Sequence, residues 1–331
     1  MILIACSRFV APVIVAGPIW FLLIGVFFAS SAIAAEARKM TVPYTPLTGA
    51  SSPLWIAIEG KIFQKYRLEI TPVYVAGSNT IVAAMVSGQF EIAGVGGGAV
   101  VLNRLGGGDL ITIGAQTGVY TNDCFARPEI KSIRDLKGKT IAVTRFGTST
   151  HFAALSALRL GGLKPTDVVL VQLGSSGERE AALSSGRVDA AMLGYPGGEL
   201  ALKRGFRQLT DLSRSEEGAF PTTAIAVRES WLKDPKNRET ALNFLRGFTD
   251  GLTLARTNAA ITKRVLRKYT RVDDDAVLQT TFEYYKKFFG ETLKVNERSY
   301  ANLLQVLDHP KAKDADPRSF FDNSLVEQIA R

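Results

Sequence analysis

A histidine stands directly beside two hydroxyl side chains in the segment RFGTSTHFAAL at residues 145–155. Ser149 and Thr150 come just before His151, and an apolar, helix-like run follows. A histidine paired with a hydroxyl is the arrangement that activates a nucleophile in covalent catalysis. A hydroxyl cluster at a helix start can instead bind an anion, because the first turn of a helix carries unpaired N–H groups and partial positive charge. The rest of the sequence has to decide between these two chemistries.

The sequence favours the anion site over catalysis. Adjacent residues on a helix point in different directions, so the spacing of Ser149, Thr150 and His151 does not place a base on a nucleophile. The chain has no G-x-S-x-G motif. Two separated histidines and two separated cysteines give no metal-ligand cluster. We therefore expect no catalytic residue, no metal and no cofactor, and a cleft enzyme that uses His151 is the alternative.

A glycine run follows one predicted strand, in AGVGGGAVV at 93–101. It contains Gly94-x-Gly96-x-x-Ala99, a weak match to the dinucleotide-binding fingerprint. Glycines also let a backbone come close to any small ligand, and that needs no phosphate group. We expect this second role.

The N-terminal segment has the layout of a secretory signal. Arg8 precedes a long apolar run, no acidic residue occurs before Glu36, and Ala32-Ile33-Ala34 forms a cleavage site of the A-x-A type. The run is long enough to span a bilayer, so an anchor that is kept is the alternative. We expect residues 1–34 to be a signal peptide, and the protein to be exported to the periplasm or the outer face of the cell membrane.

Composition and charge exclude further classes of protein. The full chain carries a net charge of +9, and removal of Arg8 with the signal leaves +8. The basic residues are scattered rather than massed, which argues against nucleic acid as a partner. Only Cys124 remains after residue 34, so the exported chain cannot form an internal disulfide. We expect a monomer whose positive charge mildly favours anionic ligands.

Strands alternate with helices, and the pattern recurs 98 residues later. The first set has strands at 40–46, 70–75 and 90–95 and helices at 54–64 and 79–87; the second has strands at 139–143, 168–173 and 188–193 and helices at 150–160 and 177–185. At this offset Gly49-Ala50-Ser51-Ser52 aligns with Gly147-Thr148-Ser149-Thr150, and GQFEIA aligns with GRVDAA. Either any two βαβ units share such a pattern, or the chain has two lobes of similar topology. The second reading predicts an α/β protein with equivalent loops at the carboxyl edges of two sheets, where ligands bind.

The pattern becomes helical after Phe220. A strand at 222–229 precedes helices at 241–255, 260–269, 273–288, 296–308 and 319–330. Apolar residues four and three apart in 241–255 predict one amphipathic face that packs on the core. We expect this helical part to pack on the first lobe.

Serine or threonine begins four of the predicted helices, in matched positions of the two repeats. These are Ser51-Ser52 before Pro53, Ser78, Ser149-Thr150 and Ser176. Each alone is an ordinary N-cap, whose side chain accepts from a backbone N–H of the first turn. Four in symmetric positions predict a cradle for an anion.

Three segments carry a resemblance to a known family: GASSPLWIAIEGKIFQKYRLEITPVYVAGSNTIVAAMVSGQFEIAGVGGG, DLKGKTIAVTRFGTSTHFAALSALRLGGLKPTDVVLV and ALSSGRVDAAML. They resemble the substrate-binding proteins of nitrate/sulfonate/taurine-type ABC importers, in the periplasmic-binding-protein type II superfamily. This resemblance implies a two-lobe α/β fold, each lobe a mixed sheet flanked by helices, with two crossing strands as the hinge. Lobe one would comprise residues 40–122 plus 222–331, and lobe two residues 123–221.

The resemblance also implies a function, a site and partners. The protein would capture a small anionic solute between the lobes and deliver it to an ABC permease; a receptor that feeds a sensor or another transporter is the alternative. The implied ligand contacts are Ser51, Ser52, Gly77, Ser78, Gly97, Ser149, Thr150, His151, Tyr195 and Phe220. Arg145 and Arg179 flank these loops as either anion partners or surface residues. Sulfonate-binding members often show Trp-acid-Pro after the last strand, whereas this chain has Gly194-Tyr195-Pro196, which argues against an alkanesulfonate and leaves room for another small, even aromatic, acid.

Overall fold

The computed structural model describes residue 11 and residues 36–330. Residues 36–330 belong to one compact unit. Apart from Ala11, the predicted signal at 1–34 lies outside the described residues. Within the described part of the chain, no helix has both the length and the apolar character needed to cross a membrane.

The first of two sheets contains strands from both ends of the described chain. Its order is β2 (Leu68–Tyr74), β1 (Arg38–Tyr44), β3 (Ile92–Val95), β10 (Ala219–Arg228) and β4 (Leu110–Val119). Strand β1 pairs in parallel with β2 and β3, whereas β10 runs antiparallel to β3 and β4. The sheet is therefore mixed: β2, β1, β3 and β4 run in one direction, and β10, between β3 and β4, runs in the opposite direction.

The second sheet has the same plan. Its order is β7 (Val169–Gln172), β6 (Thr140–Val143), β8 (Ala190–Leu193), β5 (Asp123–Ala126) and β9 (Arg207–Gln208). Strand β6 pairs in parallel with β7 and β8, and β5 runs antiparallel to β8 and β9. The chain passes from the first sheet to the second between Val119 and Asp123, and returns between Gln208 and Ala219. The expected two-lobe α/β architecture with mixed sheets is confirmed.

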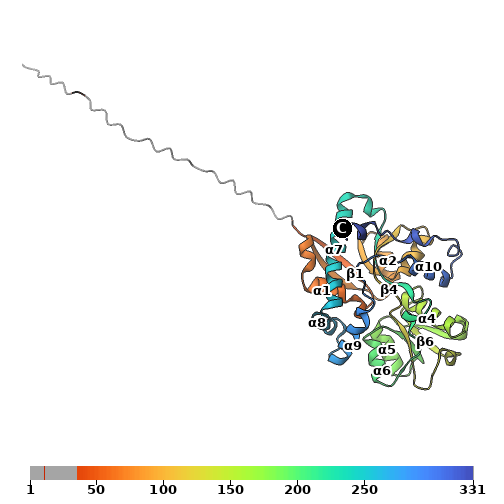
Figure 1. Cartoon of the computed structure of the whole chain (residues 1–331). Helices are drawn as coiled ribbons and strands as arrows, with labels where there is room; N and C mark the ends of the chain where they lie inside the picture. Colours follow the sequence, from red (N-terminus) through yellow and green to blue (C-terminus); the bar gives the residue numbers. More distant parts are fainter. Residues whose placement is uncertain (1–10, 12–35, 331) are drawn as a thin grey trace, which may run out of the picture. The chain divides into compact units, whose positions relative to one another are not determined.

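The helices follow the strands in the order that the repeat predicts. Those between strands are α1 (Ser52–Glu59), α2 (Ser78–Val86), α3 (Gly97–Leu105), α4 (Ser149–Leu160), α5 (Ser176–Ser184) and α6 (Gly197–Lys203). The bounds of α2 and β3 recur in α5 and β8 after 98 residues, so the internal repeat reflects a shared topology. Figure 1 shows α4, α5 and α6 grouped around β6, apart from α1, α7 and α8.

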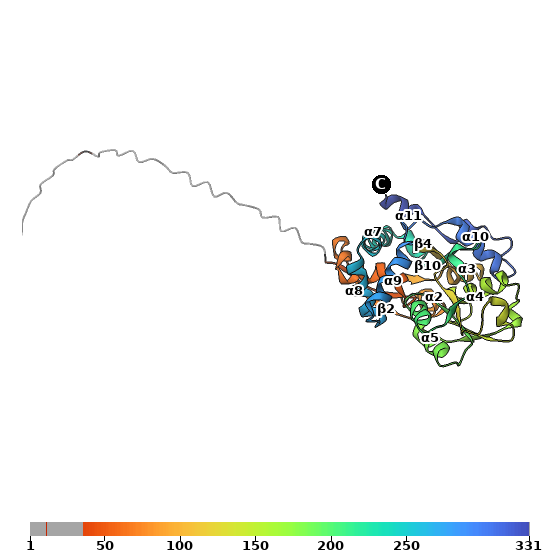
Figure 2. The same cartoon turned by 60° about the horizontal axis from the view of Figure 1, so that its bottom comes forward.

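The C-terminal part is helical, as expected. It contains α7 (Pro235–Thr257), α8 (Ala259–Thr270), α9 (Asp275–Lys286), α10 (Glu297–Val306) and α11 (Ser324–Ile329). Short 3₁₀ helices occupy Gly49–Ser51, Ile62–Tyr66, Ile133–Leu136, Pro165–Asp167, Leu212–Arg214, Trp231–Lys233 and Pro317–Phe320. Helix α10 packs on β10 and α11 on β4, and Figure 2 shows these elements together at one end of the fold.

Helix α7 is the longest helix in the described part of the chain and packs on the core. Pro235 occupies its first turn, and the Asp234 side chain caps it by accepting from the backbone N–H of Lys236. The predicted apolar face is confirmed, because Ala241, Leu245, Phe248, Leu252 and Ala255 are all buried. This face packs along α1.

Two predicted helices differ from the observed ones. The helix expected over 54–64 ends at Glu59, because Lys61 adopts a left-handed conformation with φ of 53° and a separate 3₁₀ helix follows. The helix expected over 319–330 is divided, because Phe321 forms a parallel bridge with Thr112 and its backbone is extended there. Both breaks depend on backbone geometry that periodicity of apolar residues does not report.

Substitution of Gly251 with Val should destabilise the packing of α7 on α1. A Cβ at this position would lie 2.4 Å from the Pro53 carbonyl oxygen, which is backbone and cannot move aside. Overpacking of this kind costs about 1–3 kcal/mol, and we expect a lower urea midpoint. The control is Gly162→Asn, where nothing lies within 4 Å of the added atom and asparagine tolerates the positive φ. Equal midpoints for the two variants would contradict this account.

Candidate anion-binding site

Loops from both sheets meet around one small polar cavity with a volume of about 40 Å³. Its lining residues are Thr45, Pro46, Gly77, Ser78, Gly96, Asn122, Thr144, Thr148, Ser149, Thr150, Arg179 and Thr222. None of these twelve, all within the described 36–330, carries a carboxylate or an aromatic ring. The cavity therefore offers hydroxyls, an amide and one positive charge.

The carboxyl ends of the parallel strands position this lining. Thr45 and Pro46 follow β1, Gly96 follows β3 and Thr144 follows β6. Parallel strands that share a sheet place their carboxyl ends at one edge, and this edge is where open α/β sheets bind ligands. The expectation that both sheets offer loops at such an edge is confirmed by this lining.

Arg179 is the only charged side chain among the lining residues, and it is 3% exposed. Its Nε donates to the Met192 carbonyl at 3.0 Å, and Nη1 donates to Thr144 Oγ1 at 2.7 Å and to the Gly174 carbonyl at 2.9 Å. Among the described residues, no carboxylate lies within 4.0 Å of the guanidinium. Burial lowers the pKa of Arg179 to about 10, so the group remains charged at neutral pH.

The hydroxyls of the second lobe are mostly held by its own backbone. Thr150 Oγ1 accepts from the N–H of Thr144 at 2.9 Å, and Thr148 Oγ1 donates to the Arg145 carbonyl at 2.7 Å. The two threonine oxygens are 3.2 Å apart. This network fixes the loop between β6 and α4 against the cavity.

At the cavity, one hydrogen bond connects the two lobes and a second joins two segments of the first lobe. Ser149 Oγ donates across to the Thr222 carbonyl on β10 at 3.0 Å, and Ser78 Oγ accepts from the N–H of Gly96 at 2.9 Å. The Thr222 hydroxyl is buried and has no hydrogen-bond partner within the described part of the chain. It lines the cavity and is free to bond a ligand oxygen.

At none of the four helix starts does the predicted serine or threonine cap the helix with its side chain. The N-cap of α4 is Thr148, and Ser149 and Thr150 make the other bonds described above. Ser51 is the N-cap of α1 but donates to the Pro46 carbonyl at 2.6 Å instead of capping. Ser78 is the first residue of α2 and follows Gly77, whose φ of 93° suits glycine. At α5 the cap is Ser175, one residue before the predicted Ser176.

The structure brings four of the ten residues implied by the resemblance to the cavity wall, namely Gly77, Ser78, Ser149 and Thr150. Ser51 and Ser52 are buried at the start of α1, and the Ser52 hydroxyl has no hydrogen-bond partner among the described residues. Gly97 packs against Pro221, since a Cβ there would lie 2.5 Å from the proline ring. Phe220 stacks on Tyr120 in the core, with ring centroids 4.1 Å apart.

His151 faces its own loop. Its Nδ1 accepts from the N–H of Gly147 at 3.2 Å, and the Phe146 ring meets it edge-on at 5.2 Å. Burial lowers the pKa of His151, which favours the neutral ring that this bond requires. The histidine therefore braces the turn before α4.

Tyr195 belongs to a buried cluster next to the crossing between the sheets. Its ring stacks on Tyr284 of α9, with centroids 4.1 Å apart. Asp123 lies in the same cluster, 2% exposed, and accepts from the N–H of Leu212 at 2.8 Å. Burial raises the pKa of Asp123 to about 6. The cluster links the second sheet to the C-terminal helices.

Eight lining residues were not among the implied contacts: Thr45, Pro46, Gly96, Asn122, Thr144, Thr148, Arg179 and Thr222. The strand-end rule could have found Thr45 and Pro46, the last residues of the predicted strand at 40–46, and Thr144, which directly follows the predicted strand at 139–143. Arg179 stands between two glutamates on a polar helix, so its sequence context resembles a solvated surface. Thr222 lies on β10, 73 residues after Ser149, and no local sequence pattern links the two.

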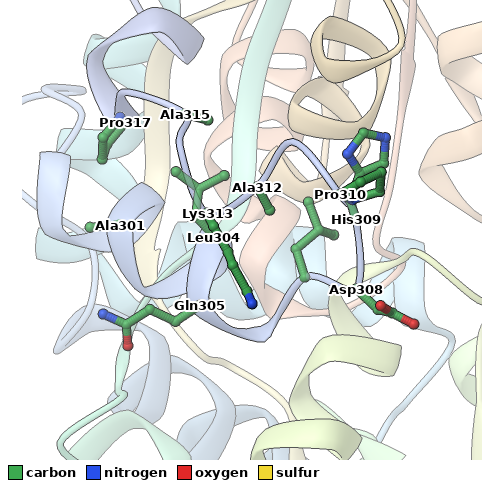
Figure 3. A pocket seen from close by; sticks show the side chains of 11 residues that line it. Ala301, Leu304, Gln305, Asp308, His309, Pro310, Ala312, Lys313, Ala315 and Pro317 are labelled. Carbon is green, nitrogen blue, oxygen red and sulfur yellow. The ribbon is translucent and has the colours of Figure 1, made fainter.

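A second hollow lies on the surface between α10 and the 3₁₀ helix at Pro317–Phe320. Figure 3 shows Asp308, His309 and Lys313 around it without a common point toward which they converge. In the described ranges, no group of three or more histidine, cysteine, aspartate or glutamate side chains is arranged to hold a metal ion. The interlobe cavity is therefore the candidate site.

A family model described as NMT1/THI5 like matches residues 50–259, more than half of the chain. The chain belongs to the NMT1/THI5-like family. The matched range starts one residue before Ser51 and contains all ten residues implied as ligand contacts; it also includes Arg179 and Thr222. It contains both crossings between the sheets.

Relatives of this NMT1/THI5-like protein support the resemblance seen in the sequence. It is 29% identical over 153 residues to a putative aliphatic sulfonates-binding protein of Escherichia coli K12, which covers 44% of this chain and 47% of that protein. The chain thus aligns with about half the length of this curated relative.

Solved structures show the same fold at low sequence identity. A protein of Bordetella bronchiseptica RB50 has a TM-score of 0.79 at 19% identity, over 88% of this chain and 96% of that one. The periplasmic nitrate-binding protein NrtA of Synechocystis PCC 6803 has a TM-score of 0.70 at 14% identity, over 89% of each chain. The predicted family resemblance and fold class are confirmed.

Replacement of Asp123 with Asn should change how stability depends on pH. Because burial raises the pKa of Asp123 from 3.8 to about 6, the folded protein binds this proton more tightly than the unfolded chain. The resulting stabilisation is complete below pH 3.8 and is lost as the pH rises through 6, up to about 3 kcal/mol. We expect the urea midpoint of D123N, relative to the parent, to be higher at pH 7.5 than at pH 4.5.

The control is Asp135→Asn, in an exposed capping box where backbone N–H groups lower the pKa of the carboxyl. Its stabilisation is present above about pH 3.8 and is lost only as the pH falls below this value, so D135N should be at nearly the same disadvantage at pH 4.5 and at pH 7.5. A D123N difference that is independent of pH would contradict the assignment.

Proposed function

We propose that this protein is an exported solute receptor, which binds a small anion in the interlobe cavity and delivers it to an ABC importer. The observation that carries this proposal is the buried guanidinium of Arg179, which lacks a carboxylate partner among the described residues. The protein would act as a monomer outside the cytoplasm, and the cavity would need no cofactor.

The energetics of burial favour an anion as the missing partner. Removing a charge from water costs several kcal/mol unless a counter-charge and hydrogen bonds compensate. Three carbonyl groups and the Thr144 hydroxyl accept from Arg179, but these neutral groups do not balance its charge. Glu178 exerts an electrostatic influence on Arg179, yet it is exposed and its carboxylate accepts from the N–H of Ser175. A bound anion would complete the site.

The other lining groups suit an oxyanion. Hydroxyls donate to oxygen, and the helices α2 and α4 begin at the cavity with Ser78 and Ser149, so their first N–H groups add partial positive charge. The buried Thr222 hydroxyl adds a donor that the described residues leave unused. The curated relative is named for sulfonates and the NrtA structure for nitrate, and both of these ligands are oxyanions.

Binding rather than catalysis fits the position of His151. Its Nδ1 is occupied by the N–H of Gly147, while the Ser149 hydroxyl donates to the Thr222 carbonyl. Neither bond joins the histidine to a nucleophile. Since a fold alone does not decide function, this local geometry is what supports a receptor over an enzyme.

Closure of the two lobes would trap the ligand. Asn79 Nδ2 donates to the Phe146 carbonyl at 3.0 Å across the mouth of the cavity, and Arg145 Nε approaches the Ala76 carbonyl at 3.4 Å. Hinge bending of two lobes around a ligand is a known mode of domain closure. The chain would bend where it crosses between the sheets, near 119–123 and 208–219.

Substitution of Arg179 with Gln should abolish anion binding. Removal of one partner of a buried charge pair costs about 2–5 kcal/mol, or roughly 30- to several-thousand-fold in affinity. The control is Arg187→Gln, which removes the same charge from an exposed position shortly after α5. The readout is thermal unfolding of protein expressed from the complete sequence, against nitrate, sulfonates and aliphatic and aromatic carboxylates. An anion at a hundred times its dissociation constant adds about 2.7 kcal/mol of stability.

The receptor proposal fails if no anion raises the unfolding temperature of the parent protein. It also fails if an anion raises the unfolding temperature of R179Q as much as that of R187Q.

Replacement of His151 with Ala should weaken binding only modestly. A demonstrated turnover that is lost in H151A while binding persists would instead support an enzyme. Ligand uptake by membranes that carry the cognate permease would distinguish an importer from a sensor.

A further inference from the structure

Both lobes also line a second hollow, a groove whose character differs from that of the polar cavity. Its lining residues are Leu47, Tyr74, Ser175, Ser176, Gly177, Glu180, Pro196, Gly197, Leu200, Tyr269, Thr270, Arg271 and Val272. The elements come from both sheets and from α8, so the groove lies between the same two lobes as the cavity. It is the only other hollow among those described that both lobes line.

The groove and the cavity share a boundary. Thr45 and Pro46 line the cavity, and Leu47, the next residue, lines the groove. Tyr74, at the end of β2, lines the groove, and its ionisation is coupled to the charge of Arg179 in the cavity. Burial raises the pKa of Tyr74, while the guanidinium acts in the opposite direction. Because Pro46 and Leu47 are neighbours in the chain, the two linings adjoin there, and a ligand too long for the cavity would reach the groove on this side.

The wall of the groove formed by the first lobe is aromatic and rigid. The Tyr74 ring lies 6.0 Å from Tyr44, which meets Trp55 edge-on at 6.1 Å. Trp55 stacks on Tyr269 with centroids 4.6 Å apart and planes within 3°. Tyr74 and Tyr269 are thus the two groove-facing ends of a row whose middle members are buried.

The second lobe supplies an aliphatic wall opposite this row. Leu200 of α6 and Pro196 line the groove, and both follow β8. Glu180 also lines it, but its carboxylate is paired with Arg204 and accepts from Ser184. The groove therefore offers two tyrosine rings and aliphatic surface, whereas the cavity lining carries no aromatic ring.

We propose that this groove is a second subsite, which binds the ring of an aromatic acid whose carboxylate or sulfonate lies at Arg179. This inference rests on the proposed function and names its substrate class. Tyrosine faces bind planar rings by stacking and edge contacts, and burying a ring adds affinity that a bare inorganic anion cannot obtain. The substrate is then an aromatic carboxylate or sulfonate rather than nitrate or a short alkyl acid.

The experiment is titration calorimetry with two matched pairs of probes, acetate with benzoate and methanesulfonate with benzenesulfonate. Each pair has the same acid group and differs in the ring. We expect the aromatic member to bind at least about tenfold more tightly in the parent protein. Equal affinities within both pairs would overturn the proposal.

Two variants test the groove itself. Tyr74→Ser removes a ring from one wall, and Leu200→Ser removes aliphatic surface from the other. Each should reduce the preference for the aromatic probe to less than about threefold, while the affinity for acetate and methanesulfonate stays the same. The matched controls are Val73→Ser and Leu202→Ser, neighbouring exposed positions that do not line the groove, and both should keep the preference. Circular dichroism and the unfolding temperature check that each variant is folded.

The outcomes separate this inference from the receptor proposal. One outcome contradicts the groove proposal alone. Arg179→Gln abolishes binding of all probes, but the groove variants either keep the parent's preference for the aromatic probe or lose affinity for both probes of a pair equally. The receptor proposal then stands. If no probe binds, or if binding is independent of Arg179, both are wrong. Selective loss of the aromatic probes in Tyr74→Ser and Leu200→Ser, with the controls unchanged, would support the second subsite.

Discussion

The buried charge of Arg179 is the constraint on which the site depends. Its Nε reaches the carbonyl of Met192 in β8, and Nη1 reaches the loop after β7 and the Thr144 hydroxyl after β6. Three parallel strands of the second sheet therefore end around one guanidinium. Neutral acceptors hold the side chain in place but leave its charge uncompensated, which is costly in a protein interior. Under the proposed function, a bound anion would supply the missing counter-charge at the edge of this sheet.

The first lobe completes the site with close backbone contacts. A Cβ at Gly96 would lie 2.5 Å from Ser149 Oγ, and a Cβ at Gly77 would lie 2.9 Å from the Arg145 side chain. Only glycine allows the loops to approach this closely. Because the lining residues come from both sheets, full coordination of a ligand requires the two lobes to meet. Under the proposed function, ligand recognition and lobe closure would therefore be one physical event.

The residues around the crossing have a mechanical role that complements the cavity. Tyr195 stacks on Tyr284, and Asp123 accepts hydrogen bonds from Leu212 and Thr210. Phe220 stacks on Tyr120, directly beside the two crossings. The resemblance implied that Tyr195 and Phe220 contact the ligand, and this stays a prediction. Neither ring is among the residues that line the cavity. The Tyr195 stack connects the second sheet to α9, whereas the Phe220 stack packs the two crossings against each other.

The sequence by itself determined the topology and the general place of the site. Strands and helices recur at an offset of 98 residues, and local patterns of this kind depend on backbone periodicity, which a sequence displays directly. Gly77, Ser78, Ser149 and Thr150 could be found because they lie at strand ends and helix starts. Only the tertiary structure decided which groups bear charge inside the cavity, since Arg179 stands between two glutamates and looks like a surface residue. It also decided that Thr222 enters the same wall and that Tyr74 and Tyr269 face one groove. Burial and long-range approach are properties of the packed chain, and the spacing of residues along a sequence does not contain them.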